Sequence, residues 1–158
     1  MKVSVFSRKM IENLISDNKF PENTAVISFC DPALKHRYKD YKPVNYNGVC
    51  DDVFYVEVDD LDLDVLESKG YTYDTFFPEA DEIAEFVYEI YNKNMDLICQ
   101  CEYGQSRSAG CAAAVLEHFF HSGIWIFANY DYYPSQIIFN KMYDALEKYK
   151  SLNIQCST

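Results

Sequence analysis

Short apolar runs alternate with helix-like segments along this chain, and this alternation constrains its fold more than any other feature. Four of the runs predict β-strands, at residues 2–6, 25–29, 53–58 and 96–100. Helices are predicted from an N-cap at Ser7 to about Asp17, over 79–93, over 108–121 and after Pro134. Residues 32–52 show no period, so we expect a loop there. Strands that alternate with helices indicate an α/β fold, a three-layer sandwich with a central, mostly parallel sheet flanked by helices.

Length and composition are those of a single domain. The chain has 158 residues, 49% of them hydrophobic, and no repeat or Gly/Ser-rich linker divides it, so we expect one domain over residues 1–158. No run approaches the roughly 18 apolar residues that a membrane helix needs. The apolar run at the N-terminus is also too short for a secretory signal of about 7–15 apolar residues. We therefore expect a cytoplasmic protein.

The net charge of −11 disfavours two classes of partner. Proteins that bind nucleic acid usually carry a basic patch, and anionic membranes attract basic segments. We therefore expect neither nucleic acid nor a membrane as partner. The charge does not exclude an anionic substrate, because a local cationic site can still hold a phosphate. No sequence feature indicates an oligomeric state.

Six cysteines and three histidines are present, without the spacing of a structural site. The cysteines lack the density of a disulfide scaffold, and Cys99-Gln100-Cys101 has no second cysteine pair at zinc-finger spacing. We therefore expect no metal and no cofactor.

The segment after the fourth predicted strand has the features of an anion-binding loop. It reads Cys-Glu-Tyr-Gly-Gln-Ser-Arg-Ser from Cys101 to Ser108, between a strand and a helix. Loop amides and a helix N-terminus attract an anion, Gly104 permits the bend, and Arg107 can grip two phosphate oxygens. The same field favours the thiolate form of Cys101, which is the nucleophilic form. Ser108 can donate a hydrogen bond to that sulfur.

This string resembles the Cys-x5-Arg-Ser phosphate-loop signature of the protein tyrosine phosphatase superfamily. It is most similar to the compact dual-specificity branch, and within it to small bacterial and phage-type predicted tyrosine phosphatases. The likeness extends to Ala25-Val-Ile-Ser with Asp31-Pro32, to the strand that ends in Asp59-Asp60, and to Tyr133-Pro134. It implies the cysteine phosphatase fold and a two-step hydrolysis of a phosphomonoester without a metal.

The resemblance also implies a role for each matching residue. Cys101 would attack phosphorus to form a phosphocysteine, a carboxylic acid would protonate the leaving oxygen, and water would then hydrolyse the intermediate. The acid is expected after the strand that ends at Val58, with Asp60 as first choice, then Asp62, then Asp59. Ser108 would stabilise the sulfur. The substrate would be bound by Glu102, Tyr103, Gly104, Gln105, Ser106 and Arg107.

Two residues depart from the family pattern. Gln100 stands where the family usually has a histidine that supports the loop, and Tyr103 replaces a usually small residue. The loop carries Glu102 and no lysine, which makes a polyanionic substrate less favourable than a single phosphomonoester. The expected substrate is therefore a phosphorylated protein or a small aryl phosphomonoester. The sequence does not decide between phosphotyrosine and phosphoserine or phosphothreonine, because the depth of the substrate pocket is set by the tertiary structure.

Three other functions use the same residues. A catalytically weak relative would bind phosphorylated peptides through Arg107 and the loop without turnover. Sulfur chemistry at Cys101 is less favoured because rhodanese-type loops usually place the arginine at a different spacing. Arsenate reduction would need a resolving thiol, for which Cys99 or Cys111 could serve. A Cys–His hydrolase is less favoured still, since nothing places a histidine near Cys101.

Overall fold

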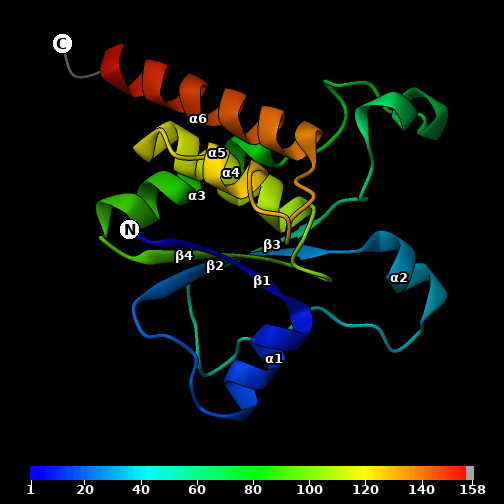
Figure 1. Cartoon of the computed structure of the whole chain (residues 1–158), viewed down its shortest axis with the longest axis vertical. Coiled ribbons are helices and arrows are strands. Elements are labelled where there is room, and N and C mark those ends of the chain that lie inside the picture. The colour runs from blue at the N-terminus through cyan, green and yellow to red at the C-terminus, as the bar shows by residue number, and fades with distance from the viewer. Residues whose placement is uncertain (156–158) are drawn as a thin grey trace.

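A four-stranded parallel sheet forms the centre of the computed structural model, which describes residues 1–155 (Figure 1). The strands are β1 (Val3–Ser7), β2 (Thr24–Cys30), β3 (Val53–Glu57) and β4 (Asp96–Cys101). Their order is β1-β4-β2-β3, and all three pairings are parallel. All four predicted strands are therefore confirmed. Because the strands run the same way, β2, β3 and β4 end at one edge of the sheet.

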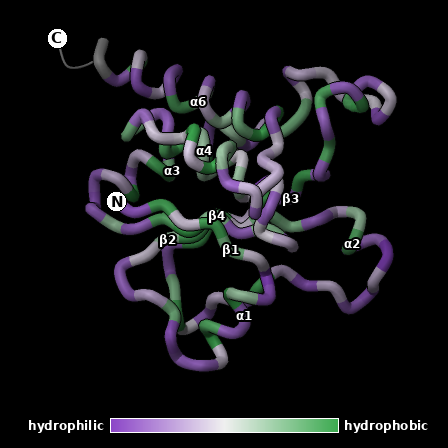
Figure 2. The backbone as a smooth tube through the Cα atoms, in the orientation of Figure 1, coloured by the Kyte–Doolittle hydropathy of each residue, from purple (hydrophilic) through white to green (hydrophobic). Residues whose placement is uncertain are grey.

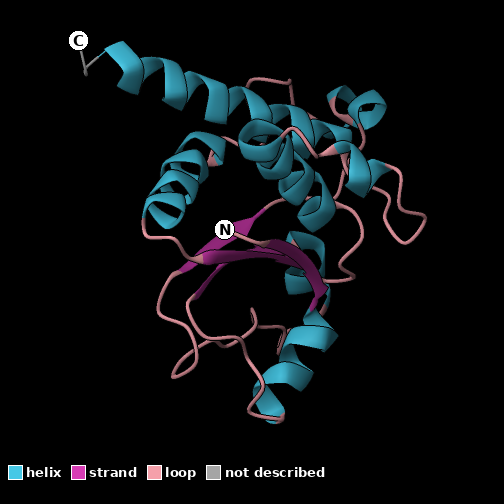
Figure 3. Cartoon of the chain, turned by 60° about the vertical axis from the view of Figure 1, so that its left-hand side comes forward, coloured by secondary structure: helices cyan, strands magenta, loops and turns pink. Residues whose placement is uncertain are grey.

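Helices cover both faces of the sheet, so the predicted three-layer sandwich is confirmed. Figures 1 and 3 show the layers: α3 (Ala80–Asn92), α4 (Arg107–Phe120) and α6 (Gln136–Gln155) lie over one face. The other face is covered by α1 (Arg8–Ser16), together with chain from the segment between β2 and β3. Ser7 caps α1 as predicted, accepting a hydrogen bond from the Met10 amide at 3.2 Å.

The two layers enclose cores of unequal size, and apolar residues gather on the strands between them (Figure 2). The larger core includes Ile27, Val87, Val115 and Met142, none of which has any exposed surface. The smaller core joins Ile11 of α1 to Val26, Val44, Tyr46 and Ile98. The central strand β2 is buried along its whole length because both cores contact it.

The structure corrects one element of the sequence prediction and adds others. Residues 32–52, predicted as a loop, begin with a short helix, α2 (Pro32–Arg37). Asp31 caps it by accepting from the Ala33 amide at 2.9 Å, and Pro32 occupies the first turn, where its missing N–H costs nothing. Six residues are too few to show a helical period, which is why the pattern missed it. The short helices α5 (Ile124–Phe127), η1 (Leu63–Val65) and η2 (Glu67–Lys69) were not predicted either.

Cys156 lies outside the described residues, whereas Cys30, Cys50, Cys99, Cys101 and Cys111 are free thiols. Among the described residues, no helix is both long enough and apolar enough to cross a bilayer.

The close approach of α4 to the start of α6 depends on Gly110. A Cβ at this position would lie 2.5 Å from the Ser135 carbonyl oxygen. Alanine normally stabilises a helix interior relative to glycine by about 1 kcal/mol, but here overpacking of about 1–3 kcal/mol should exceed that gain. We expect Gly110→Ala to lower the free energy of unfolding, measured by urea denaturation. An unchanged or higher midpoint would show that α6 moves freely away from α4.

Candidate active site

The predicted anion-binding loop connects the carboxyl end of β4 to the first turn of α4. Cys101 is the last residue of β4 and Arg107 the first of α4, so residues 102–106 make the turn between them. The Cys101 side chain is almost fully enclosed, with 2% of the residue exposed. Its Sγ lies 3.0 Å from the Oγ of Ser108, which is itself buried. The contact expected between these two residues is therefore present.

The neighbouring cysteines lie in environments that keep them as thiols. Burial raises the pKa of Cys30, even though the nearby Arg107 acts in the opposite direction. The hydrogen bond with Cys111, together with burial, raises the pKa of Cys99 well above its ordinary value. A resolving thiol at Cys99 would thus have to act from a strongly protonated state. Cys101 differs from both in lying at the end of β4, where the loop to α4 begins, with the hydroxyl of Ser108 against its sulfur.

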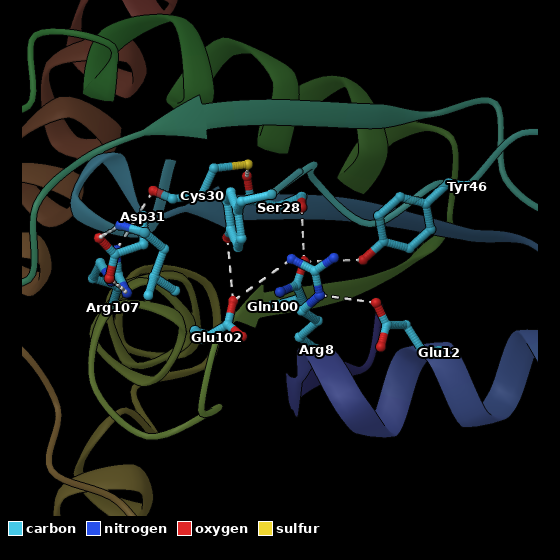
Figure 4. A network of polar contacts seen from close by, with 11 residues as sticks. Arg8, Glu12, Ser28, Cys30, Asp31, Tyr46, Gln100, Glu102 and Arg107 are labelled. Atoms are coloured by element: carbon cyan, nitrogen blue, oxygen red, sulfur yellow. Dashed lines mark hydrogen bonds and ion pairs between the residues drawn. The ribbon is translucent and has the colours of Figure 1, made fainter. Parts of the chain in front are cut away.

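Arg107 is buried as a charged side chain, with 1% of the residue exposed. Nη1 donates to the Val58 carbonyl at 2.8 Å and approaches the Cys30 carbonyl at 3.5 Å. Nη2 pairs with Asp31 Oδ2 at 3.3 Å, as Figure 4 shows. Nε is buried and has no hydrogen-bond partner within residues 1–155. The guanidinium is therefore fixed by the ends of β2 and β3, with one buried donor still unsatisfied.

Asp31 is a site residue to which the sequence analysis assigned no role, naming it only as part of the family likeness. One carboxylate oxygen caps α2 and the other binds Arg107, so this side chain couples the end of β2 to the loop. The signal was available: Asp31 directly follows the buried strand β2 of a parallel sheet, and the candidate acids were likewise sought just past the end of a strand.

Of the three candidate acids, Asp60 is the one that contacts the loop. Its Oδ1 accepts a hydrogen bond from Ser106 Oγ at 2.6 Å, and its Oδ2 lies 3.8 Å from Arg107 Nε. The side chain is 38% exposed, so it borders both solvent and the loop. Within residues 1–155, no hydrogen bond or ion pair joins Asp59 or Asp62 to the loop. The geometry favours the first-ranked candidate.

The remaining loop residues show how the loop is held in place. Gly104 has φ of +69°, and a Cβ there would lie 2.5 Å from the Ser7 backbone nitrogen. Glu102 accepts from Tyr41 Oη at 3.2 Å and lies 3.8 Å from Arg8 Nη1, so its carboxylate is engaged away from the loop centre (Figure 4). The Gln105 carbonyl accepts from the Tyr133 amide at 3.0 Å. Tyr103 is 72% exposed and points into solvent rather than into a closed pocket.

Gln100 supports the sheet rather than the loop. Its side chain is buried, and Oε1 accepts from Ser28 Oγ at 2.7 Å and from Tyr46 Oη at 3.2 Å (Figure 4). Burial raises the pKa of Tyr46, which therefore stays a neutral donor. Successive residues of a strand face opposite sides of the sheet, so Gln100 faces the smaller core and Cys101 the larger one. The support expected from this position reaches the loop only through the backbone of β4.

Within residues 1–155, no three side chains of His, Cys, Asp or Glu are placed to bind a metal ion together.

Similarity to solved structures gives the fold. No protein-family model and no curated protein matches the sequence. The human tyrosine phosphatase-like serine/threonine/tyrosine-interacting protein aligns with a TM-score of 0.54 and 14% identity, over 94% of this chain and 87% of that one. PTPMT1 in complex with PI(5)P aligns at 0.51 and 13%, over 96% and 94%. The PTP-2 phosphatase of Cydia pomonella aligns at 0.52 and 11%, over 91% and 85%. The chain therefore has the fold of these phosphatases, as its sequence predicted.

The buried hydrogen bonds of Gln100 generate a stability prediction. Gln100→Leu would leave the hydroxyls of Ser28 and Tyr46 without their shared acceptor in a buried site. We expect it to lower the free energy of unfolding by about 1–3 kcal/mol in urea denaturation. The control is Gln105→Leu, an exposed position that should change stability by no more than about 0.5 kcal/mol. Equal effects of the two substitutions would show that the Gln100 bonds contribute little.

Proposed function

We propose that this chain, built on the protein tyrosine phosphatase fold, is a cysteine-dependent phosphomonoester hydrolase that works through a phosphocysteine intermediate. One observation carries the proposal: a buried arginine, fixed by two strand ends, keeps an unsatisfied Nε donor beside a loop that begins with an enclosed cysteine. A buried guanidinium donor is expected to have an acceptor, and a phosphate oxygen supplies one. The fold alone would not distinguish this function, because one fold hosts many activities.

The first step is attack of Cys101 Sγ on phosphorus. The S–P bond forms as the P–O bond to the leaving group breaks, and Asp60 gives its proton to the departing oxygen. Arg107 and the loop amides hold the three equatorial oxygens, where the transition state carries its charge. Because the guanidinium is already oriented by Val58 and Asp31, little reorganisation is needed when the phosphate binds.

The second step returns the enzyme to its starting state. Asp60, now a carboxylate, takes a proton from water as that water attacks phosphorus and the P–S bond breaks. Ser108 Oγ, 3.0 Å from the sulfur, donates to the thiolate that leaves. Inorganic phosphate is released, and the two steps balance in atoms and electrons without a metal or a redox partner.

A second function is supported by a specific observation. The usual loop-supporting histidine is replaced by Gln100, whose side chain bonds to Ser28 and Tyr46 instead. The fold is also shared with the human tyrosine phosphatase-like serine/threonine/tyrosine-interacting protein, whose name describes an interacting protein rather than a phosphatase. The alternative is therefore a module that binds phosphorylated peptides through Arg107 without hydrolysing them.

The nucleophile is tested by Cys101→Ser. We expect this change to lower hydrolysis of p-nitrophenyl phosphate by at least about 10³-fold, because serine is not ionised at neutral pH. Vanadate should inhibit the wild-type protein and chelators should not. Cys50→Ser is the control, since among residues 1–155 the Cys50 thiol bonds only to the backbone oxygens of Thr24 and Asp52. Activity that survives Cys101→Ser and vanishes with a chelator would contradict the mechanism. Phosphate-competed binding of a phosphopeptide, without turnover, would favour the alternative.

The general acid is tested by comparing leaving groups. Asp60→Asn should lower kcat about 10²–10³-fold for phenyl phosphate, whose phenolate is a poor leaving group. The loss should be smaller for p-nitrophenyl phosphate, because its leaving group needs less protonation. Asp62→Asn, with the same charge change two residues away, should leave both rates nearly unchanged. A larger loss from Asp62→Asn than from Asp60→Asn would reassign the acid.

A further inference from the structure

Positive charge is concentrated in one short segment of this acidic chain. We call residues 32–42 the basic strap: it comprises α2 and the residues that follow it to Lys42. Four of the chain's 14 lysines and arginines lie in it, with Asp40 as its one carboxylate, so its net charge is +3. Since the whole chain carries −11, the other 147 residues together carry −14. This contrast makes the strap the natural place for a second anionic group to bind.

The basic strap is tied to the candidate active site at both ends. Asp31, the residue before it, binds the guanidinium of Arg107 at 3.3 Å. Near its other end, Tyr41 donates to the carboxylate of Glu102, the loop residue next to Cys101, at 3.2 Å. In Figure 1, α2 lies beyond the carboxyl ends of the strands, at the edge of the sheet where the loop lies. The strap therefore forms part of the rim of the site.

Three of the four cations on the basic strap are free to bind a ligand. Lys35 is ion-paired with Glu57 at 2.6 Å. The side chains of Arg37, Lys39 and Lys42 are exposed and have no hydrogen bond or ion pair with any residue from 1 to 155. The six residues of α2 rise roughly 9 Å, at about 1.5 Å per residue. That rise carries Arg37, the last residue of α2, away from Asp31, whose carboxylate binds the Arg107 guanidinium.

We propose that Arg37, Lys39 and Lys42 form a subsite for acidic side chains that flank the phosphorylated residue of a peptide substrate. This rests on the proposed function, because it places the phosphate over Cys101. An extended peptide advances about 3.4 Å per residue, so carboxylates two or three residues from the phosphate reach the strap. Complementary charge at the rim of a site raises the local concentration of such a substrate and orients it.

The distribution of charge favours a peptide over a phosphoinositide in a bilayer. The three cations are spread along the basic strap, while the phosphate loop itself has no lysine. A bilayer surface would also face the remainder of the chain, whose net charge of −14 opposes approach to an anionic membrane. A short acidic peptide can meet the strap alone.

Two matched phosphopeptides test the subsite. One carries Asp and Glu on both sides of the phosphorylated residue, and the other carries Asn and Gln at the same positions. We expect the wild-type kcat/KM to be about tenfold higher for the acidic peptide at low salt, and the ratio to shrink as salt screens the charges. In the triple variant R37Q/K39Q/K42Q the ratio should fall to about one or two. A wild-type ratio near one would overturn the proposal.

The control removes the same three charges elsewhere. Lys19 and Lys93 lie before β2 and β4, at the opposite edge of the sheet, and Lys150 lies near the end of α6. K19Q/K93Q/K150Q should keep the wild-type ratio. An equal fall in both triple variants would mean that only net charge matters, and the subsite would be rejected.

Two further outcomes separate this proposal from the function on which it rests. If the wild-type protein hydrolyses neither peptide nor p-nitrophenyl phosphate, the proposed function fails. The subsite is then tested by binding instead of turnover: the dissociation constants of the acidic and the neutral peptide are compared for the wild-type protein and the two triple variants. Phosphatidylcholine vesicles that contain a phosphatidylinositol monophosphate are the remaining probe. Loss of their hydrolysis in R37Q/K39Q/K42Q, with an unchanged peptide ratio, would overturn the peptide in favour of the lipid.

Discussion

The buried guanidinium of Arg107 is the interaction on which the rest of the candidate site depends. Removing a charge from water costs several kcal/mol unless partners replace the lost hydration. Here the replacement comes from the Val58 and Cys30 carbonyls and the Asp31 carboxylate, all at the ends of β2 and β3. These strands are neighbours in the sheet, so their ends converge where α4 begins. The carbonyl and carboxylate groups at the strand ends thus hold the arginine, and α4, which follows β4, carries it at its first position.

The loop around Cys101 is shaped by elements on either side of it. At one side, Gly104 lies against the backbone of Ser7, and the Glu102 carbonyl accepts from the Arg8 amide at the start of α1. At the other, carbonyls of the loop accept from amides of the segment that leads into α6. A loop held from both sides is preorganised, which is the condition for electrostatic stabilisation of a bound oxyanion.

Electrostatics separate the site from the remainder of the surface. The chain as a whole is strongly acidic, which favours solubility and opposes non-specific contact with anions. Against that background, the basic strap, with a net charge of +3, adjoins the residue that binds Arg107 and makes this region attractive to negative charge. Asp31 and Glu102 keep this region together by binding its two ends. The phosphate of a substrate and the acidic side chains that flank it would then be recognised by adjacent parts of the same edge of the sheet.

The sequence by itself determined the α/β class, all four strands, the main helices and the loop from Cys101 to Ser108. These are local properties, set by hydrophobic period, capping residues and spacing along the chain. It also ranked Asp60 first, from its distance past a strand. The tertiary structure alone decided that Gln100 bonds to Ser28 and Tyr46, that Asp31 holds Arg107, and that α2 borders the site. Those contacts join residues more than 50 positions apart, and no local pattern encodes which distant strand ends will meet.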